Sequence, residues 1–354
     1  MTKDMSAAAA MQSTTREPLL TVRNLQKHYA IKGGSQPWQP QRVVRAVDGV
    51  QFDVYEGETL GVVGESGCGK STTARLVMHL VDPSQGSLLF NGMQVGGREM
   101  PIKEFRRQVQ MVFQDSYSSL NPRLTIEDSI TFGPRVHGVS QREALRRAHD
   151  LMARVGLEPG RFCERYPHEL SGGQRQRVNI ARALALQPRL VVLDEAVSAL
   201  DKSVEAQVLN LLLDLKAEFG LTYMFISHDL NVVRFISDRV MVMYLGKVAE
   251  IGPSDALFEQ PAHPYTHALL SSVPSMDPDQ RTEVAPLSGD PPNPIDPPSG
   301  CRFHPRCPQA SEICMREEPQ HIVQAARSVA CHLHRKPAES PVAAQARGSM
   351  ETCV

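Results

Sequence analysis

The chain has 354 residues, of which 41% are hydrophobic and 22% charged, so it is long enough to bury one substantial core and to carry a smaller second module. Lysine and arginine number 38 against 39 acidic residues, which excludes a strong overall field that would attract nucleic acid or an anionic membrane surface. No apolar run approaches the roughly 20 residues that a helix needs to cross a bilayer. The sequence predicts a globular chain that does not itself span a membrane.

The start of the chain indicates a leader followed by a small sheet. Residues 1–17 are rich in alanine, serine and threonine and lack the continuous apolar stretch of a secretory signal, so we expect a disordered leader there. Short β-like stretches run from Leu19 to about Val54, with an exposed loop at the glycine- and proline-containing residues 33–37. This pattern predicts a small antiparallel sheet.

The middle of the chain alternates buried strands with helices. Residues 59–63 have a buried-strand pattern that runs directly into a glycine loop and a helical stretch at 70–80. Further strands are predicted at 110–113, 190–193 and 222–226, and further helices at 140–154, 174–186 and 204–219. Strands that alternate with helices predict an α/β fold with a mainly parallel sheet.

The texture of the sequence changes after about residue 275. It becomes proline-rich and irregular, and four of the seven cysteines lie close together there, at positions 301, 307, 314 and 331. We expect residues 276–336 to form an appendix separate from the domain at 18–275, and residues 337–354, where alanine, serine and glutamine dominate, to be disordered. Without a secretory signal, a disulfide framework is not expected.

Residues 64–71 read Gly-Glu-Ser-Gly-Cys-Gly-Lys-Ser and satisfy the phosphate-loop pattern. Glycines let backbone N–H groups point at phosphate oxygens, and the following helix adds its dipole. We expect Lys70 to reach the β and γ phosphates of ATP and Ser71 to ligate Mg²⁺. The nucleotide contacts are expected from Gly64, Glu65, Ser66, Gly67, Cys68, Gly69, Lys70, Ser71 and Thr72. Since no paired base is evident, Cys68 is interpreted as a packing residue rather than a nucleophile.

Residues 190–195 read Leu-Val-Val-Leu-Asp-Glu, an apolar strand that ends in two acids. Such a strand end places carboxylates at the edge of a parallel sheet where ligands of these folds bind. We expect Asp194 to hold the Mg²⁺ shell and Glu195 to polarise the attacking water. The alternative interpretation is that the two acids are only an exposed strand end followed by a turn. The presence of a phosphate loop in the same chain disfavours it.

Residues 170–177 read Leu-Ser-Gly-Gly-Gln-Arg-Gln-Arg. A Ser-Gly-Gly turn at a helix N-terminus presents a hydroxyl and bare backbone amides, which makes a second anion site, although alone it also reads as a helix cap. Twenty residues before the Asp-Glu pair, it resembles the signature of ATP-binding cassette (ABC) proteins, which other phosphate-loop ATPases lack. The signature positions that would contact ATP are Ser171, Gly172, Gly173 and Gln174.

The resemblance covers about residues 19–274 and implies a phosphate-loop cassette fold. That fold has a mainly parallel sheet core, an antiparallel β subdomain and a helical subdomain, here at about 115–170. Gln114 corresponds to the glutamine that senses Mg²⁺ and the attacking water, Asp201 lies in the loop that crosses the dimer interface, and His228 matches the histidine that contacts the γ-phosphate. Tyr29 stands where the family stacks an aromatic ring on adenine, although a lone tyrosine is more often ordinary core or surface.

The resemblance also implies an ATPase that works as a pair. Two cassettes of this family face each other head to tail, so that the phosphate loop of one meets the Ser-Gly-Gly turn of the other across ATP. The reaction implied is phosphoryl transfer to water with ATP and Mg²⁺, and the catalytic residues implied are Lys70, Gln114, Glu195 and His228. In this family the pair closes when ATP binds and reopens after hydrolysis, and this movement does work only if another subunit binds the cassette. The helical subdomain is the part that docks membrane partners.

Three segments resemble one branch of the family, the ATP-binding subunits of dipeptide and oligopeptide permeases: residues 112–123, 261–266 and 301–308. This branch implies import of di- or oligopeptides at the cytoplasmic face of the inner membrane, by a chain bound peripherally to two transmembrane permease subunits. An extracytoplasmic solute-binding protein and a second cassette complete such importers, and we expect the second cassette to be a related, non-identical chain. Relatives with similar tails carry nickel or glutathione, which leaves the solute open.

Cys301, Cys307, Cys314 and Cys331 have five, six and sixteen residues between neighbours. Four thiolates can hold a metal, but the close pairs of a zinc ribbon are absent. Some members of the peptide-permease group bind a 4Fe-4S cluster through four such cysteines. A 4Fe-4S cluster is the first expectation, and Zn²⁺ or free thiols remain the alternatives.

A different class would be a soluble cassette ATPase that acts on DNA or ribosomes. DNA-repair members insert a long coiled coil between the phosphate loop and the Asp-Glu strand, and no sustained heptads stand there in this chain. Ribosome-acting members usually carry two cassettes, whereas this sequence has one. We therefore expect no nucleic-acid partner. A regulatory module without turnover would be expected to lose Glu195 or His228, and both are present.

Overall fold

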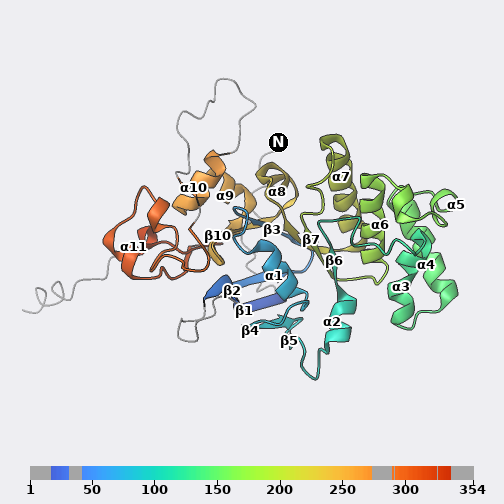
Figure 1. The fold of residues 1–354 in the computed structure, drawn as a ribbon, viewed down its shortest axis with the longest axis horizontal. Coiled ribbons are helices and arrows are strands. Elements are labelled where there is room, and N and C mark those ends of the chain that lie inside the picture. Colours follow the sequence, from blue (N-terminus) through green and yellow to red (C-terminus); the bar gives the residue numbers. More distant parts are fainter. Residues whose placement is uncertain (1–16, 32–41, 273–288, 291, 325, 336–354) are drawn as a thin grey trace, which may run out of the picture.

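The computed structural model describes residues 17–31, 42–272, 289–290, 292–324 and 326–335 (Figure 1). The predicted loop at 33–37, the predicted tail and all but the last residue of the predicted leader lie outside the described residues. Within those ranges we find no helix that is both long and apolar enough to cross a bilayer.

A central sheet runs through the molecule and joins strands of the middle of the chain to two strands near its C-terminal end. In spatial order its strands are β11 (Ile322–Gln324), β12 (Arg327–Val329), β10 (Lys247–Pro253), β9 (Arg239–Tyr244), β3 (Thr59–Val63), β8 (Thr222–Ile226), β7 (Leu190–Asp194) and β6 (Val109–Val112). The pairs from β9 to β6 are parallel, whereas β10, β12 and β11 add on antiparallel. The predicted mainly parallel core is confirmed.

Side chains on the inner strands alternate between two cores, one on each face of the sheet. Val191 and Leu193 of β7 pack into the core that α6, α7 and α8 cover, and Leu190 and Val192 face the core on the side of β1 and β2. The period of two in a strand therefore divides a continuous apolar run between two buried faces. Full burial of such a side chain contributes roughly 1.5–3 kcal/mol.

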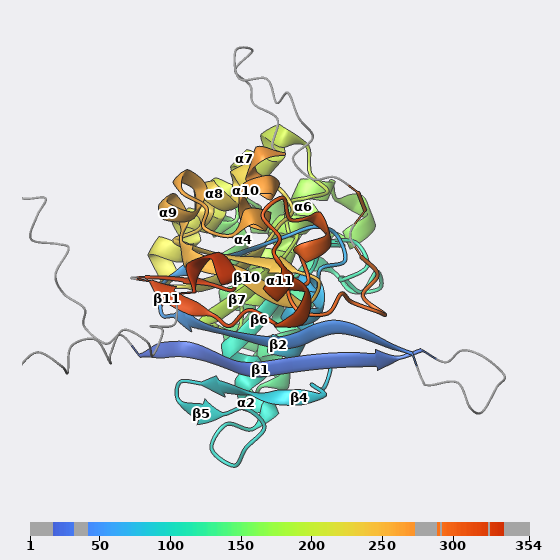
Figure 2. The ribbon, with the colours of Figure 1, turned by 90° about the vertical axis from the view of Figure 1, so that its left-hand side faces the viewer.

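A second, antiparallel sheet lies against the core, with strand order β2 (Val43–Tyr55), β1 (Pro18–Ala30), β4 (Gln85–Phe90) and β5 (Met93–Gln94). Figure 2 shows β1 and β2 as long strands side by side, with β4 and β5 beyond β1. These are two continuous thirteen-residue strands where short stretches were predicted, and each continues through local register shifts.

Helices cover the sheets and form an outlying lobe. The α-helices are α1 (Lys70–Val77), α2 (Ile102–Gln108), α3 (Ile126–Val136), α4 (Gln141–Arg154), α5 (Pro159–Phe162), α6 (Gly172–Leu184), α7 (Lys202–Phe219), α8 (Leu230–Ile236), α9 (Ser254–Glu259), α10 (Pro264–Ser271) and α11 (Glu312–Arg316). Short 3-10 turns are η1 (Pro167–Glu169), η2 (His304–Arg306) and η3 (His332–His334). In Figure 1, α3, α4 and α5 lie at one end of the long axis and α11 at the other.

The C-terminal extension is part of the central sheet. β12 pairs with β10 through Glu250 and Val329, and β11 adds beyond it. Glu250 is fully buried, accepts hydrogen bonds from the N–H groups of Ala262 and His263, and lies 3.6 Å from Arg327 of β12. The extension predicted at 276–336 thus contributes two strands to the central sheet, which the sequence did not indicate, because strands only three residues long give no pattern that sequence reasoning can detect.

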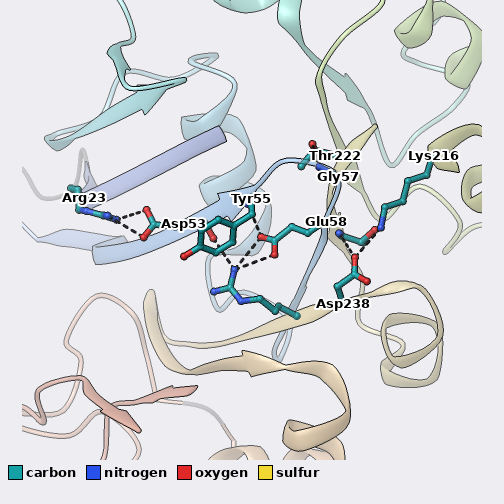
Figure 3. Close-up of polar contacts among 10 residues, drawn as sticks. Arg23, Asp53, Tyr55, Gly57, Glu58, Lys216, Thr222 and Asp238 are labelled. Atoms are coloured by element: carbon teal, nitrogen blue, oxygen red, sulfur yellow. Dashed lines mark hydrogen bonds and ion pairs between the residues drawn. The ribbon is translucent and has the colours of Figure 1, made fainter. Parts of the chain in front are cut away.

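A polar network joins the two sheets at the amino ends of the inner strands (Figure 3). Glu58 is buried, accepts a hydrogen bond from the N–H of Tyr55 and pairs with Arg239 at 3.0 Å. Burial raises the pKa of Glu58, and Arg239 only partly offsets this. Nearby, Asp238 accepts from the N–H of Thr59 and from Lys216. The buried carboxylate of Glu58 is thus stabilised in its charged form mainly by the Arg239 guanidinium.

Replacing Arg239 with methionine tests this dependence. We expect Arg239→Met to lower the free energy of unfolding by about 3 kcal/mol, because it leaves a carboxylate buried without its partner. Arg239 lowers the pKa of Glu58, so its removal should raise that pKa further above the unfolded value. Glu58 then takes up a proton in the variant first, and the deficit should shrink as pH falls from 7 towards 5. Urea unfolding at several pH values measures both effects.

The matched control is Arg23→Met, which removes the exposed pair with Asp53 that is also drawn in Figure 3. This pair is solvated, so its loss should cost less than about 1 kcal/mol and should not depend on the protonation of Glu58. Equal losses in the two variants, or a deficit in Arg239→Met that does not vary with pH, would contradict the assignment.

Candidate functional site

Four functional segments leave the central sheet at the same edge. The phosphate loop follows β3, Gln114 follows β6, Glu195 follows β7 and His228 follows β8. Because these strands are parallel, their carboxyl ends lie together, and ligands of open α/β sheets bind at that edge. Gly64 and His228, which are more than 160 positions apart in the chain, thus lie at the same edge of the sheet.

Two glycines of the phosphate loop have backbone geometry that a larger residue would not accept. Gly64 has φ of 149° and a Cβ there would fall on the carbonyl oxygen of Met243, while Gly69 has φ of 107° and a Cβ would fall on that of Ala46. Without these side chains the loop lies tightly against its neighbours. α1 then begins at Lys70, so its free N–H groups face the loop.

Lys70 is buried and bound to the loop itself. Its Nζ donates to the carbonyl oxygens of Gly64 at 2.7 Å and of Glu65 at 3.0 Å. The Cys68 thiol is also buried, which raises its pKa and keeps it in the unreactive thiol form. The structure therefore agrees with the interpretation of Cys68 as a packing residue.

Ser71 and Asp194 meet across the edge of the sheet. The Ser71 hydroxyl donates to Asp194 Oδ1 at 2.9 Å. Burial raises the pKa of Asp194, and the bond from Ser71 opposes this. A hydroxyl and a carboxylate that converge in a partly closed site are the hard oxygen donors that Mg²⁺ takes, and a cation would relieve the cost of the buried carboxylate. The residues present therefore fit Mg²⁺.

Glu195 has an unusual backbone and two polar neighbours. Its φ is 48°, in the left-handed region, and its N–H is held by the carbonyl of Ile226 at 3.0 Å. Its carboxylate accepts from Gln114 Nε2 at 2.8 Å and lies 3.6 Å from His228 Nδ1. Strain of this kind persists only where the surroundings hold the residue, and it is concentrated at functional sites.

One cavity collects these groups. It is lined by Val44, Ala46, Ser66, Gly67, Gly69, Lys70, Ser71, Thr72, Gln114, Glu195, His228 and Pro294. Sequence reasoning named the polar members and missed Val44, Ala46 and Pro294. Val44 and Ala46 belong to β2, which the sequence indicated only as part of a sheet, and nothing local marks Pro294.

Tyr29 is placed at the margin of this cavity. It pairs in register with Val44, and the residue is 40% exposed, but it is not among the described residues that line the cavity. The Lys27 ammonium lies 5.3 Å from the ring centre. Tyr29 is thus exposed next to a residue that lines the cavity.

The Ser-Gly-Gly turn caps α6, as the sequence indicated. The Ser171 hydroxyl accepts from the N–H of Gln174, and the Gln174 side chain accepts from the N–H of Ser171. Gly173 packs against α7, since a Cβ there would lie 2.6 Å from Val204 Cγ1. None of residues 171–174 lines the cavity at the phosphate loop, nor does Asp201, which is the N-cap of α7. Within the described residues, the turn and the phosphate loop therefore lie at separate places in one chain.

Comparison with known proteins decides the family. Residues 47–198 match the family model described as ABC transporter, and residues 249–314 match that described as oligopeptide/dipeptide transporter, C-terminal region. The probable peptide ABC transporter ATP-binding protein y4tS of Sinorhizobium fredii is 51% identical over 94% of this chain and 95% of its own length. The chain belongs to the ABC transporter ATP-binding proteins.

Further relatives and solved structures agree. The oligopeptide transport ATP-binding protein AppF of Bacillus subtilis is 49% identical over 92% of this cassette protein and 100% of its own length. The structure of cbiO1 from Clostridium perfringens, described as part of an ABC transporter complex, matches with a TM-score of 0.59 and 27% identity over 69% of this chain and 92% of that one. The ATP-binding cassette MJ0796, solved as a dimer with ADP and phosphate, matches with a TM-score of 0.58 and 30% identity over 66% and 98%.

The four C-terminal cysteines of this ABC protein converge in one module. The N–H of Cys301 donates to the carbonyl of Cys314 at 2.8 Å. Burial raises the pKa of Cys301 to about 11, and the fields of Cys314, Cys331 and Cys307 add to this. All six cysteines that the structure describes are free.

The spacing of these sulfurs bears on what they can hold. No three of the four approach within 4.8 Å of one another, by the distances among the described residues. Zinc with Zn–S bonds of about 2.3 Å needs sulfurs about 3.8 Å apart. Among the described residues, the four sulfurs therefore do not form a preformed set at the spacing of one zinc ion. Elsewhere, Glu127, His149 and Cys163 do come within 4.8 Å, but Glu127 and His149 already pair at 2.6 Å.

Proposed function

We propose that this chain is the ATP-hydrolysing subunit of an importer for di- or oligopeptides, bound peripherally at the cytoplasmic face of the inner membrane. The observation that carries the ATPase assignment is the meeting of the phosphate loop, Gln114, Glu195 and His228 in one cavity. The peptide assignment is supported by the match to the oligopeptide/dipeptide transporter region and by relatives named as peptide transport proteins.

In this proposal Lys70 exchanges partners when ATP enters. Its ammonium is held by two backbone carbonyls, and the charged β and γ phosphate oxygens are stronger acceptors. Ser71 and Asp194, with Gln114 near them, would hold Mg²⁺, which neutralises charge on the phosphate oxygens. The phosphate loop and the start of α1 bind the triphosphate through their N–H groups. Tyr29 would stack on the adenine.

Glu195 and His228 act on the far side of the γ-phosphate. The Glu195 carboxylate accepts a hydrogen bond from water and orients it for attack on phosphorus, and Gln114 and His228 hold that carboxylate in place. The water oxygen bonds to the γ-phosphorus as the bond to the bridging oxygen breaks. The products are ADP, inorganic phosphate and a proton.

A second cassette completes the site. The turn at 171–174 lies outside the cavity of its own chain, so it is available to the ATP of a facing cassette, with Asp201 at the interface. We propose a related, non-identical chain as the partner. The dimer of MJ0796 supports pairing as a property of the family.

The helical subdomain would dock two transmembrane permease subunits. Residues that follow Gln114 are anchored to α6, since Asn179 donates to the carbonyl of Ser116 and accepts from Ser119. Movement at Gln114 would therefore pass to the helix that carries the signature turn. Large apolar side chains stand exposed in this part of the chain: Phe113, Tyr117, Phe132, Val136 and Tyr166. An extracytoplasmic solute-binding protein would deliver the peptide to the permeases.

We also propose that Cys301, Cys307, Cys314 and Cys331 hold a 4Fe-4S cluster. Four buried or half-buried free thiols that lie together in one part of the chain support this. When bound, such a cluster supplies a one-electron redox centre or a rigid structural link. The thiols themselves would be deprotonated by the metal, which removes the cost shown by their raised pKa values.

Glu195→Gln tests the function in the assembled transporter, reconstituted in vesicles with its permeases and binding protein. The variant should bind ATP normally and lose at least about 100-fold in hydrolysis, because the water is no longer polarised, and peptide uptake should stop. Glu56→Gln, which alters an exposed glutamate paired with Arg189, is the control and should transport normally.

Three results would overturn parts of this proposal. Near-normal hydrolysis by Glu195→Gln would refute its role. Uptake of nickel or glutathione without peptide uptake would reject the peptide assignment. Hydrolysis that never couples to uptake of any solute would favour a soluble, non-transport ATPase.

The cluster is tested by anaerobic purification followed by iron, sulfide and zinc analysis. We expect about four iron and four sulfide per chain, lost in Cys307→Ser and kept in Cys163→Ser, whose cysteine lies in the helical subdomain. Zinc alone, or no metal in any preparation, would reject the cluster.

A further inference from the structure

Glu65, the second residue of the phosphate loop, is bound by the C-terminal module, the described residues 292–324 and 326–335 of the extension. Arg306 donates from Nη1 to Glu65 Oε2 at 2.8 Å and from Nη2 to Oε1 at 3.1 Å. This is a two-pronged pair, and it is shielded, since the Arg306 side chain is 6% exposed and that of Glu65 22%. Such geometry constrains both partners more than a surface ion pair does.

The backbone of Glu65 is held from the same side. Its N–H donates to the Tyr265 hydroxyl at 3.0 Å, and Tyr265 is fully buried. The ring of Tyr265 packs on Tyr244 and on Phe303, which lies three residues before Arg306. Arg306 also reaches the Tyr244 hydroxyl at 3.4 Å. Side chain and main chain of Glu65 are therefore fixed by one aromatic cluster and one guanidinium.

A second arginine of the module supports the other side of the loop. Arg302 is buried, pairs with Asp48 and donates to the carbonyl of Leu245. The neighbouring Gly246 donates to the carbonyl of Cys68 at 2.8 Å. The module thus contacts the phosphate loop directly at Glu65. It also contacts Leu245, whose neighbour Gly246 is hydrogen-bonded to Cys68 of the loop.

The charge at Glu65 makes this contact relevant to ATP. Glu65 precedes Ser66, which lines the cavity, and its carbonyl oxygen is one of the two that hold Lys70. An unpaired carboxylate at this position would repel a triphosphate, and the protein interior screens that repulsion less than water does. The guanidinium of Arg306 cancels the charge.

We propose that Arg306 is a positioning residue for ATP binding, which neutralises Glu65 and fixes the start of the phosphate loop. This rests on the proposed function only in taking ATP as the ligand. The affinity for ATP then depends on the contact between the C-terminal module and the loop as well as on the loop itself.

The test is ATP affinity of the purified full-length chain, with a fluorescent ATP analogue and Mg²⁺. Arg306→Gln should weaken binding about tenfold, because a carboxylate faces the triphosphate without its cation. In the Glu65→Gln background the same change should weaken binding less than about twofold, since no charge remains to be cancelled. Arg306→Lys keeps the charge without the fork and should fall between the wild type and Arg306→Gln. In the assembled transporter, KM for ATP should rise more than kcat falls.

Two controls separate the possible failures. Arg316→Gln removes an exposed arginine of the same module that pairs with Glu312, and it should bind ATP as the wild type does. Lys70→Ala should lose ATP binding, and if it does not, the proposed function fails rather than the role of Arg306. Unchanged affinity in Arg306→Gln would overturn the inference. A loss of equal size with and without the Glu65 carboxylate would do so too, because it would show a structural effect independent of charge.

Discussion

The ATP site depends on the parallel pairing of the phosphate-loop strand with its neighbours. β3 pairs with β8 and β9, and β7 lies between β8 and β6, so four strand ends that carry functional groups share one edge. Asp194 lies opposite Ile226 in this register and bonds to Ser71. A slip of one residue would exchange the two core faces of a strand and move Asp194 away from Ser71. The two apolar cores therefore enforce the register that the chemistry needs.

The polar groups of the site are hydrogen-bonded to one another. Lys70 is bound to loop carbonyls, Ser71 to Asp194, and Gln114 to Glu195. Each of these contacts occupies an atom that the proposed reaction requires for ATP, Mg²⁺ or water. Binding of ATP is then an exchange of hydrogen bonds, in which charged phosphate oxygens replace neutral carbonyls and the buried charges gain closer partners.

Local patterns predicted the parts of the fold that depend on neighbouring residues. The strand at 222–226 matches its prediction residue for residue, whereas α1 stops at Val77, before the predicted end at residue 80, because His79 has a positive φ of 52°. The polar residues of the cavity were predicted because their motifs are short. The Arg306 contact was not, since it joins residues 241 positions apart and depends on how the aromatic cluster packs. The three-residue strands of the extension were missed for a similar reason: only their partner β10 makes them strands.

We propose that the phosphate loop of this chain and the Ser-Gly-Gly turn of a facing cassette close on the same ATP. The most direct measurement is a structure of the assembled transporter that carries Glu195→Gln, solved with ATP and Mg²⁺. The account predicts that the γ-phosphate lies against Lys70 and Ser71 on one side and against the signature serine of the other cassette on the opposite side. A closed complex in which that serine is far from the γ-phosphate at both sites would contradict it.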